Sequence, residues 1–167
     1  MIRIAAVASY IATIVLANAM TDRFGLVPIG FGLLVTAGTF AAGFALVARD
    51  WVQTTSGRAV VLAAIVAGAA LSYLTSSPAL AVASGIAFLA SELVDLAVFS
   101  PLRERTLAGA VLLSSVASAP VDTVAFLAIA GFPLTWQAVL GQFIVKTSIA
   151  AFVAVIIVTR ERRPVAA

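Results

Sequence analysis

Long uncharged runs dominate the sequence. They cover residues 4–21, 24–48, 59–91, 106–121, 123–145 and 147–159. A helix needs about 20 mostly apolar residues to cross the hydrocarbon core of a bilayer, and several runs reach that length. Hydrophobic residues make up 63% of the chain and charged residues only 10%, so a water-soluble domain would lack the polar residues to cover its surface. The sequence therefore predicts an integral membrane protein.

The expected fold is all-α. Backbone groups in lipid must form hydrogen bonds within the protein, which allows helices or closed barrels. The many Ala, Leu and Val residues favour helices over the alternating pattern of a membrane barrel. We expect one domain over residues 1–167, a bundle of six transmembrane helices with short connections and no room for a soluble catalytic domain. The predicted helices cover residues 3–19, 31–48, 59–76, 80–100, 107–130 and 138–159.

The distribution of arginine predicts the orientation. If the amino terminus is cytoplasmic, eight arginines fall on the inside: Arg3, Arg49, Arg58, Arg103, Arg105, Arg160, Arg162 and Arg163. The outside loops hold only Arg23. This imbalance over short loops follows the positive-inside rule and places both termini in the cytoplasm. The arginines are spread over loop ends without a basic patch among aromatic residues, so nucleic-acid binding is not expected.

The first segment has a second interpretation. Arg3, a short apolar stretch and Ala17-Asn18-Ala19 resemble a signal peptide with its cleavage site. Cleavage would leave five spans in the same orientation. We favour a retained first span because small residues are common in membrane helices, and mass spectrometry of the purified protein decides between the two.

The sequence contains no cysteine and no histidine. Disulfides, thiolate nucleophiles and Cys/His metal sites are therefore excluded, and we expect neither a metal nor a cofactor. No P-loop or dinucleotide-binding glycine motif occurs either. We expect no enzymatic activity, and energy for any active transport must come from an ion gradient, trapping of the solute or a separate motor protein.

Four ionisable residues lie inside the apolar segments: Glu92, Asp95, Asp122 and Lys146. A charge at the centre of a membrane helix costs about 2.5–3.5 kcal/mol on insertion scales, so such residues usually have a partner or a function. Helical spacing places polar residues on three faces, which are Glu92 with Asp95, Ser115 with Ser118 and Asp122, and Gln142 with Lys146. We expect these faces to surround one cavity. The alternative is a buried ion pair between Lys146 and one carboxylate that only fixes helix register.

Two further regions are interpreted as structural. Arg49, Asp50 and Arg58 follow the second predicted helix and are expected to anchor it at the membrane boundary. Residues 24–33 contain three glycines and a proline, and they form either a plain outside loop or a short re-entrant cover over the site.

One family shares several of these residues. The segments 91–95, 102–103 and 114–126, with Asn18, Gly131, Gln142 and Lys146, resemble the vitamin uptake transporter (VUT) family, also called the queuosine precursor transporters. The resemblance is strong over residues 85–150. It implies a six-helix importer of 7-deazaguanines in the bacterial inner membrane, similar in architecture to the substrate-binding components of energy-coupling-factor transporters.

The resemblance also implies a substrate. A guanine-like edge presents N1–H beside an exocyclic amine, which one carboxylate accepts together, while its carbonyl takes a donor from Lys146 or Gln142. Aromatic rings would stack on the heterocycle. The expected substrate-binding residues are Asn18, Phe88, Glu92, Asp95, Ser115, Ser118, Asp122, Phe126, Gln142 and Lys146.

The leading hypothesis is import of 7-cyano-7-deazaguanine or a related compound, with proton coupling as a secondary prediction. Two alternatives stay open: a binding component that works with a separate ATP-driven motor, and a membrane enzyme that uses its carboxylates in acid–base chemistry. The expected partners are the solute and the lipid bilayer, and the sequence leaves open whether the chain forms a homo-oligomer.

Overall fold

The computed structural model describes residues 2–161. Arg162 and Arg163, counted above among the inside arginines, lie outside the described residues. The elements in chain order are α1 (Ile2–Phe24), β1 (Leu26–Gly30), β2 (Leu33–Thr36), α2 (Thr39–Ser56), α3 (Arg58–Thr75), α4 (Pro78–Leu102), α5 (Leu107–Ile129) and α6 (Trp136–Glu161). The prediction of an all-α bundle with six helices is confirmed, with one small β-hairpin added.

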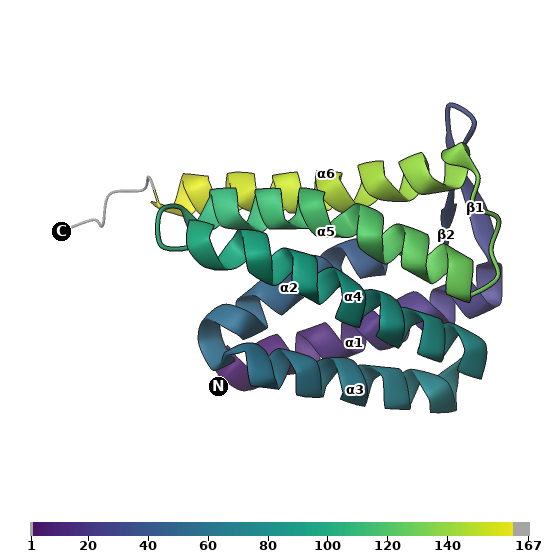
Figure 1. The fold of residues 1–167 in the computed structure, drawn as a ribbon, viewed down its shortest axis with the longest axis horizontal. Helices are drawn as coiled ribbons and strands as arrows, with labels where there is room; N and C mark the ends of the chain where they lie inside the picture. The colour runs from purple at the N-terminus through teal and green to yellow at the C-terminus, as the bar shows by residue number, and fades with distance from the viewer. Residues whose placement is uncertain (1, 162–167) are drawn as a thin grey trace.

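The six helices run roughly parallel or antiparallel to one another (Figure 1). α5 and α6 lie side by side along one edge of the bundle, and α1 and α3 lie along the other (Figure 1). Between these edges, α2 packs against α1 and α6, and α4 packs against α3 and α5. The two central helices do not pack closely on each other, which leaves room between them for long polar side chains.

Local sequence explains several helix ends. Pro78 opens α4, where its missing N–H is no loss and its fixed φ suits the first turn. The Thr106 hydroxyl accepts a hydrogen bond from the Gly109 N–H at 3.3 Å and so caps α5. Gly57 separates α2 from α3 with a φ of 84°, a backbone conformation that residues with a side chain rarely adopt.

The predicted second helix was misplaced. We expected it over residues 31–48, but α2 spans Thr39–Ser56, because residues 26–36 form an antiparallel β-hairpin instead. The turn of the hairpin has positive φ at Gly30, Phe31 and Gly32. Segment 24–33, for which a loop and a re-entrant cover were both open, therefore belongs largely to this hairpin, and its second strand packs against α6.

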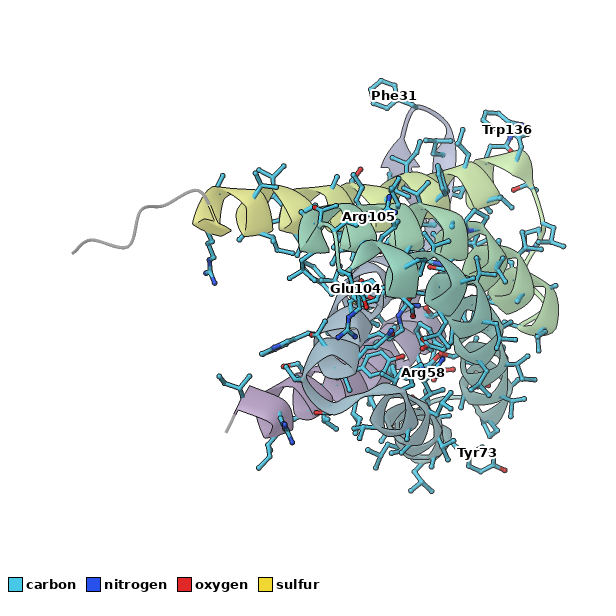
Figure 2. All side chains as sticks on the ribbon, turned by 60° about the vertical axis from the view of Figure 1, so that its left-hand side comes forward. Phe31, Arg58, Tyr73, Glu104, Arg105 and Trp136 are labelled. Carbon is cyan, nitrogen blue, oxygen red and sulfur yellow. The ribbon has the colours of Figure 1, made fainter. Side chains whose placement is uncertain are left out.

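The surface of the bundle suits a bilayer. The helices α1, α3, α4, α5 and α6 are long and apolar enough to cross a membrane. The remaining helix, α2, is less apolar and contains Arg49 and Asp50. Large apolar side chains are exposed along the outer helix faces. Phe31 and Trp136 project at the hairpin end (Figure 2). Arg58 begins α3, and Glu104 and Arg105 lie between α4 and α5, at the opposite end of the bundle (Figure 1). This distribution agrees with the predicted orientation.

Gly38 is a point of close contact between α1 and the start of α2. Its N–H donates to the Thr21 hydroxyl at 3.1 Å, and a Cβ at this position would overlap the backbone carbonyl of Ala17. Gly38→Ala is therefore expected to lower the free energy of unfolding by about 1–3 kcal/mol, because rigid backbone must shift. Thermal unfolding in detergent measures this. Gly85→Ala is the control, since its Cβ would meet only the Ala69 side chain at 3.3 Å, and equal stability of the two variants would contradict the prediction.

Candidate functional site

The first polar cluster is centred on Lys146 and joins α5 to α6. The Lys146 Nζ donates to Asp122 Oδ2 at 2.7 Å, to Thr123 Oγ1 at 2.8 Å and to Gln142 Oε1 at 3.3 Å. These three hydrogen bonds use the full donor capacity of the ammonium group. All four side chains are buried, so the charge of Lys146 is compensated inside the bundle. We call these four residues the Lys146 cluster.

A small cavity of about 20 Å³ adjoins the Lys146 cluster. It is lined by Ala17, Asn18, Thr21, Thr36, Gly38, Ala42, Ser84, Phe88, Asp122, Phe126, Gln142 and Lys146. A site needs about 10–15 Å³ of such volume to hold one water molecule, whereas pockets for small organic ligands measure about 300–1,000 Å³. The cavity is therefore large enough for about one water molecule and too small for an organic ligand.

The cavity brings together six of the ten predicted residues: Asn18, Phe88, Asp122, Phe126, Gln142 and Lys146. They come from four helices, and Thr36 at the end of the hairpin also reaches the cavity. Some of their hydrogen-bonding groups have no partner within the described residues. Within residues 2–161, the buried Gln142 Nε2 has no hydrogen-bond partner, while Asn18 Nδ2 donates to the Ser72 hydroxyl at 3.0 Å.

The second polar cluster lies between the two central helices. It consists of Arg49 and Asp50 from α2 with Glu92 and Asp95 from α4, and we call it the Arg49 cluster. Arg49 forms ion pairs with all three acidic groups, at 3.2 Å to Asp50 Oδ1 and 3.4 Å to Glu92 Oε2, and through Nη2 to Asp95 Oδ1. Each of the four side chains is at most 3% exposed. The prediction that Arg49 and Asp50 are boundary anchors is therefore wrong.

The hydrogen bonding of the Arg49 cluster is incomplete. Arg49 Nε and Nη2 both donate to Asp50 Oδ1, at 3.3 and 3.2 Å. The contacts of Arg49 with Glu92 and Asp95 are close in distance, yet the carboxylate oxygens of both residues lack a hydrogen bond of good geometry within the described chain. One guanidinium thus faces three carboxyl groups, so the fully ionised cluster would carry two uncompensated negative charges in a buried position. Such charges are costly unless protons or further partners neutralise them.

Tyr10 on α1 is a buried polar residue near members of both clusters. Its side chain is 1% exposed, and its hydroxyl has no hydrogen-bond partner among residues 2–161. The hydroxyl is close enough to Arg49, Glu92 and Asp122 to interact electrostatically with all three. Sequence reasoning missed Tyr10, because a single tyrosine in an apolar helix carries no spacing signal.

Four predicted site residues do not line the cavity. Glu92 and Asp95 belong to the Arg49 cluster. Ser115 and Ser118 on α5 are fully buried, and their hydroxyls have no hydrogen-bond partner in the described part of the chain. The structure thus divides the predicted site into two adjacent clusters where we expected one common cavity.

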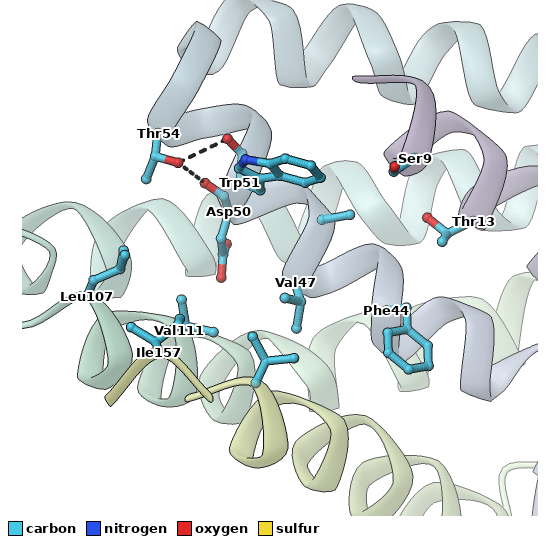
Figure 3. A pocket seen from close by; sticks show the side chains of 12 residues that line it. Ser9, Thr13, Phe44, Val47, Asp50, Trp51, Thr54, Leu107, Val111 and Ile157 are labelled. Carbon is cyan, nitrogen blue, oxygen red and sulfur yellow. Dashed lines mark hydrogen bonds between the residues drawn. The ribbon is translucent and has the colours of Figure 1, made fainter. Parts of the chain in front are cut away.

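Asp50 is one of the residues that line a larger apolar groove. It has a volume of about 480 Å³ and is lined by Ser9, Thr13, Phe44, Val47, Ala48, Asp50, Trp51, Thr54, Leu107, Val111, Val153 and Ile157. They come from the first half of α1, from α2 between Phe44 and Thr54, from the start of α5 and from the second half of α6, so the groove lies mainly in the half of the bundle that contains Ile2 and Glu161. The Asp50 carboxyl group extends from α2 toward Val111 and Ile157 (Figure 3).

Comparison with protein-family models matches residues 4–159 to a family described as "Putative vitamin uptake transporter". The match includes every residue of the two clusters and nearly the whole described bundle. No curated protein and no solved structure matches the chain.

Proposed function

Because the chain belongs to the vitamin uptake transporter family, we propose that it imports a queuosine precursor, 7-cyano-7-deazaguanine or a related 7-deazaguanine, across the bacterial inner membrane. The family match indicates membrane transport, and the five apolar helices fit a multi-pass protein. The substrate is argued from the chemistry of the Lys146 cluster.

The observation that carries this proposal is the arrangement of acceptor and donors around the cavity. Asp122 supplies a carboxylate that suits the paired N1–H and amine donors of a guanine-like edge. Lys146 and the Gln142 Nε2, which has no hydrogen-bond partner within residues 2–161, supply donors for the carbonyl of the same ring. Phe88 and Phe126 line the same cavity and offer aromatic faces to a planar heterocycle.

Binding requires the small cavity to widen. The Lys146 ammonium and the Asp122 carboxylate satisfy each other in this structure, so the substrate would take over part of that pairing. A planar ligand with donors and an acceptor on one edge can form hydrogen bonds with both groups of such a pair, so neither charge is left without a partner. The site suits such a planar solute better than a sugar, which lacks an aromatic face for Phe88 and Phe126, or a fatty chain, which lacks hydrogen-bonding groups. We further propose that import is coupled to protons, because the Arg49 cluster holds more carboxyl groups than its one guanidinium can neutralise.

Direct binding tests the substrate. We expect purified protein to bind radiolabelled 7-cyano-7-deazaguanine, and an excess of unlabelled 7-deazaguanines to displace it more effectively than guanine or adenine. Equal displacement by guanine would indicate a general purine permease, and no binding would contradict the proposal. If binding occurs but purified protein in liposomes does not transport, a separate motor protein is required.

A further inference from the structure

We infer that the Arg49 cluster is the proton-binding site of the transport cycle and that Asp50, which lines the apolar groove, takes up and releases this proton on the side of the groove. The inference rests on the proposed import function and assigns the coupling to residues that do not line the substrate cavity. It is carried by the position of Asp50 and by the charges that surround it.

Asp50 connects the cluster to the groove. Its Oδ1 accepts both hydrogen bonds from Arg49, while its Oδ2 is buried and has no partner within residues 2–161. The carboxyl group forms part of the groove wall (Figure 3). α5 and α6 present only apolar side chains there, from Leu107, Val111, Val153 and Ile157. A free carboxylate oxygen beside such a wall is poorly solvated, so a proton on that oxygen removes an unfavourable charge.

The charged and titratable groups around the Arg49 cluster come from all six helices. Asp50 itself interacts with Tyr10 on α1, Arg49 on α2, and Glu92 and Asp95 on α4. Arg58 on α3 interacts with Glu92, and Asp122 on α5, which pairs with Lys146 on α6, interacts with Tyr10. Lys146 is already paired with Asp122, and Arg58 is exposed to solvent at the start of α3, where water weakens its effect. Arg49 thus remains the only buried cation of the described chain that faces the three carboxyl groups. Protons are the neutralising species that fits the remaining charge.

A metal cation fits the cluster less well. The Arg49 guanidinium already occupies the position between the carboxyl groups that a cation would take. Across residues 2–161, no three acidic side chains are arranged to hold a metal ion together. A proton needs only one free oxygen, and Asp50 provides it.

The placement of the clusters suggests how the proton affects transport. The substrate cavity and the Arg49 cluster both include residues of α4, and Tyr10 interacts electrostatically with Asp122 and with members of the Arg49 cluster. Arg49 and Asp50 both lie on α2, whereas the ion pairs of Arg49 with Glu92 and Asp95 join α2 to α4. Neutralising Asp50 weakens its hydrogen bonds with Arg49 and so changes how strongly Arg49 binds the two carboxyl groups of α4. With the predicted orientation, most of the groove lies in the cytoplasmic half of the bundle, so a proton released from Asp50 on this side would move down the usual inward gradient of a bacterial cell.

The first experiment needs no substrate. Infrared spectroscopy detects the C=O stretch of a protonated carboxylic acid, which an ionised carboxylate lacks. We expect purified wild-type protein to show a buried carboxylic acid signal that titrates with pH, Asp50→Asn to lose or reduce it, and Asp22→Asn to retain it, since Asp22 is exposed at the end of α1. Asp50→Glu is expected to restore a titrating signal at a shifted frequency. An unchanged signal in Asp50→Asn, or no titrating signal in the wild type, would overturn the inference.

The second experiment uses 7-cyano-7-deazaguanine and liposomes that contain a pH-sensitive dye. We expect wild-type import to move protons with the substrate. Asp50→Asn is expected to lose proton movement and at least 10-fold of the accumulation, while it still exchanges labelled for unlabelled substrate. Wild-type import without proton movement would overturn the inference and leave the proposed function intact. If the wild type neither binds nor imports the compound, the proposed function fails, and the infrared titration still decides whether the cluster binds a proton.

Discussion

Arg49→Ala is expected to be strongly destabilising, lowering the free energy of unfolding by roughly 3–5 kcal/mol near neutral pH. The change removes the guanidinium that faces Asp50, Glu92 and Asp95 and leaves three carboxyl groups buried without a cation. It also removes the side chain that spans the gap between α2 and α4. Thermal unfolding of purified protein in detergent measures the loss.

The dependence on pH separates the loss of charge from the loss of packing. Protonated carboxyl groups need no cation, so the deficit of Arg49→Ala should shrink as the pH falls and grow as the pH rises. Arg49→Lys should fall between the wild type and the alanine variant, because one ammonium group cannot reach three carboxylates as the planar guanidinium does. Arg58→Ala is the matched control, since Arg58 is exposed. A deficit that does not change with pH would show that Arg49 acts only through packing.

Much of the bundle could be predicted from the sequence. The helices α1, α3, α4, α5 and α6 lie close to their predicted ranges, because lipid leaves an apolar segment few alternatives to a helix. The contacts of Lys146 with Asp122 and Gln142 could also be predicted from the sequence. Helical spacing puts Gln142 and Lys146 on one face, and α5 and α6 are neighbours in sequence.

The hairpin and α2 could not be predicted in the same way. An uncharged run is compatible with a helix or with strands, and the glycines at positions 30 and 32 were interpreted as a loop rather than a β-turn. This error shifted the expected second helix toward the amino terminus and left Arg49 and Asp50 outside it. A charged pair directly after an apolar run usually marks a membrane boundary.

One signal would have corrected the interpretation of Arg49. Glu92, Asp95 and Asp122 are three intramembrane acids, and Lys146 neutralises only one of them. The other two acids needed either a second inward-facing cation or protons, and Arg49, directly after the apolar run 24–48, was one candidate for that cation. Pairing between residues more than 40 positions apart, such as Arg49 with Glu92 and Asp95, depends on which helices become neighbours, and spacing along the chain does not contain that information.

Asp122→Asn is expected to weaken binding of 7-cyano-7-deazaguanine by at least about 100-fold. An amide keeps the size of the side chain but cannot accept the two adjacent donors of the ligand together. Each hydrogen bond to a charged group contributes about 1.5–3 kcal/mol, and loss of two such bonds corresponds to more than two powers of ten in the dissociation constant. Equilibrium binding of the radiolabelled compound to purified protein measures this, and Asp22→Asn is the exposed control.

Stability and recognition must be separated in this variant, because Asp122→Asn also leaves the Lys146 ammonium buried without its carboxylate. The double variant Asp122→Asn with Lys146→Met removes both charges, and replacing a buried ion pair as a unit is often tolerated. We therefore expect the double variant to unfold at a temperature near that of the wild type and still to bind at least 100-fold more weakly. If it binds with wild-type affinity, the pair only fixes the register of α5 and α6, and the substrate site lies elsewhere in the bundle. If it folds without binding, the pair recognises the ligand, because a purely structural role would have been restored together with the stability.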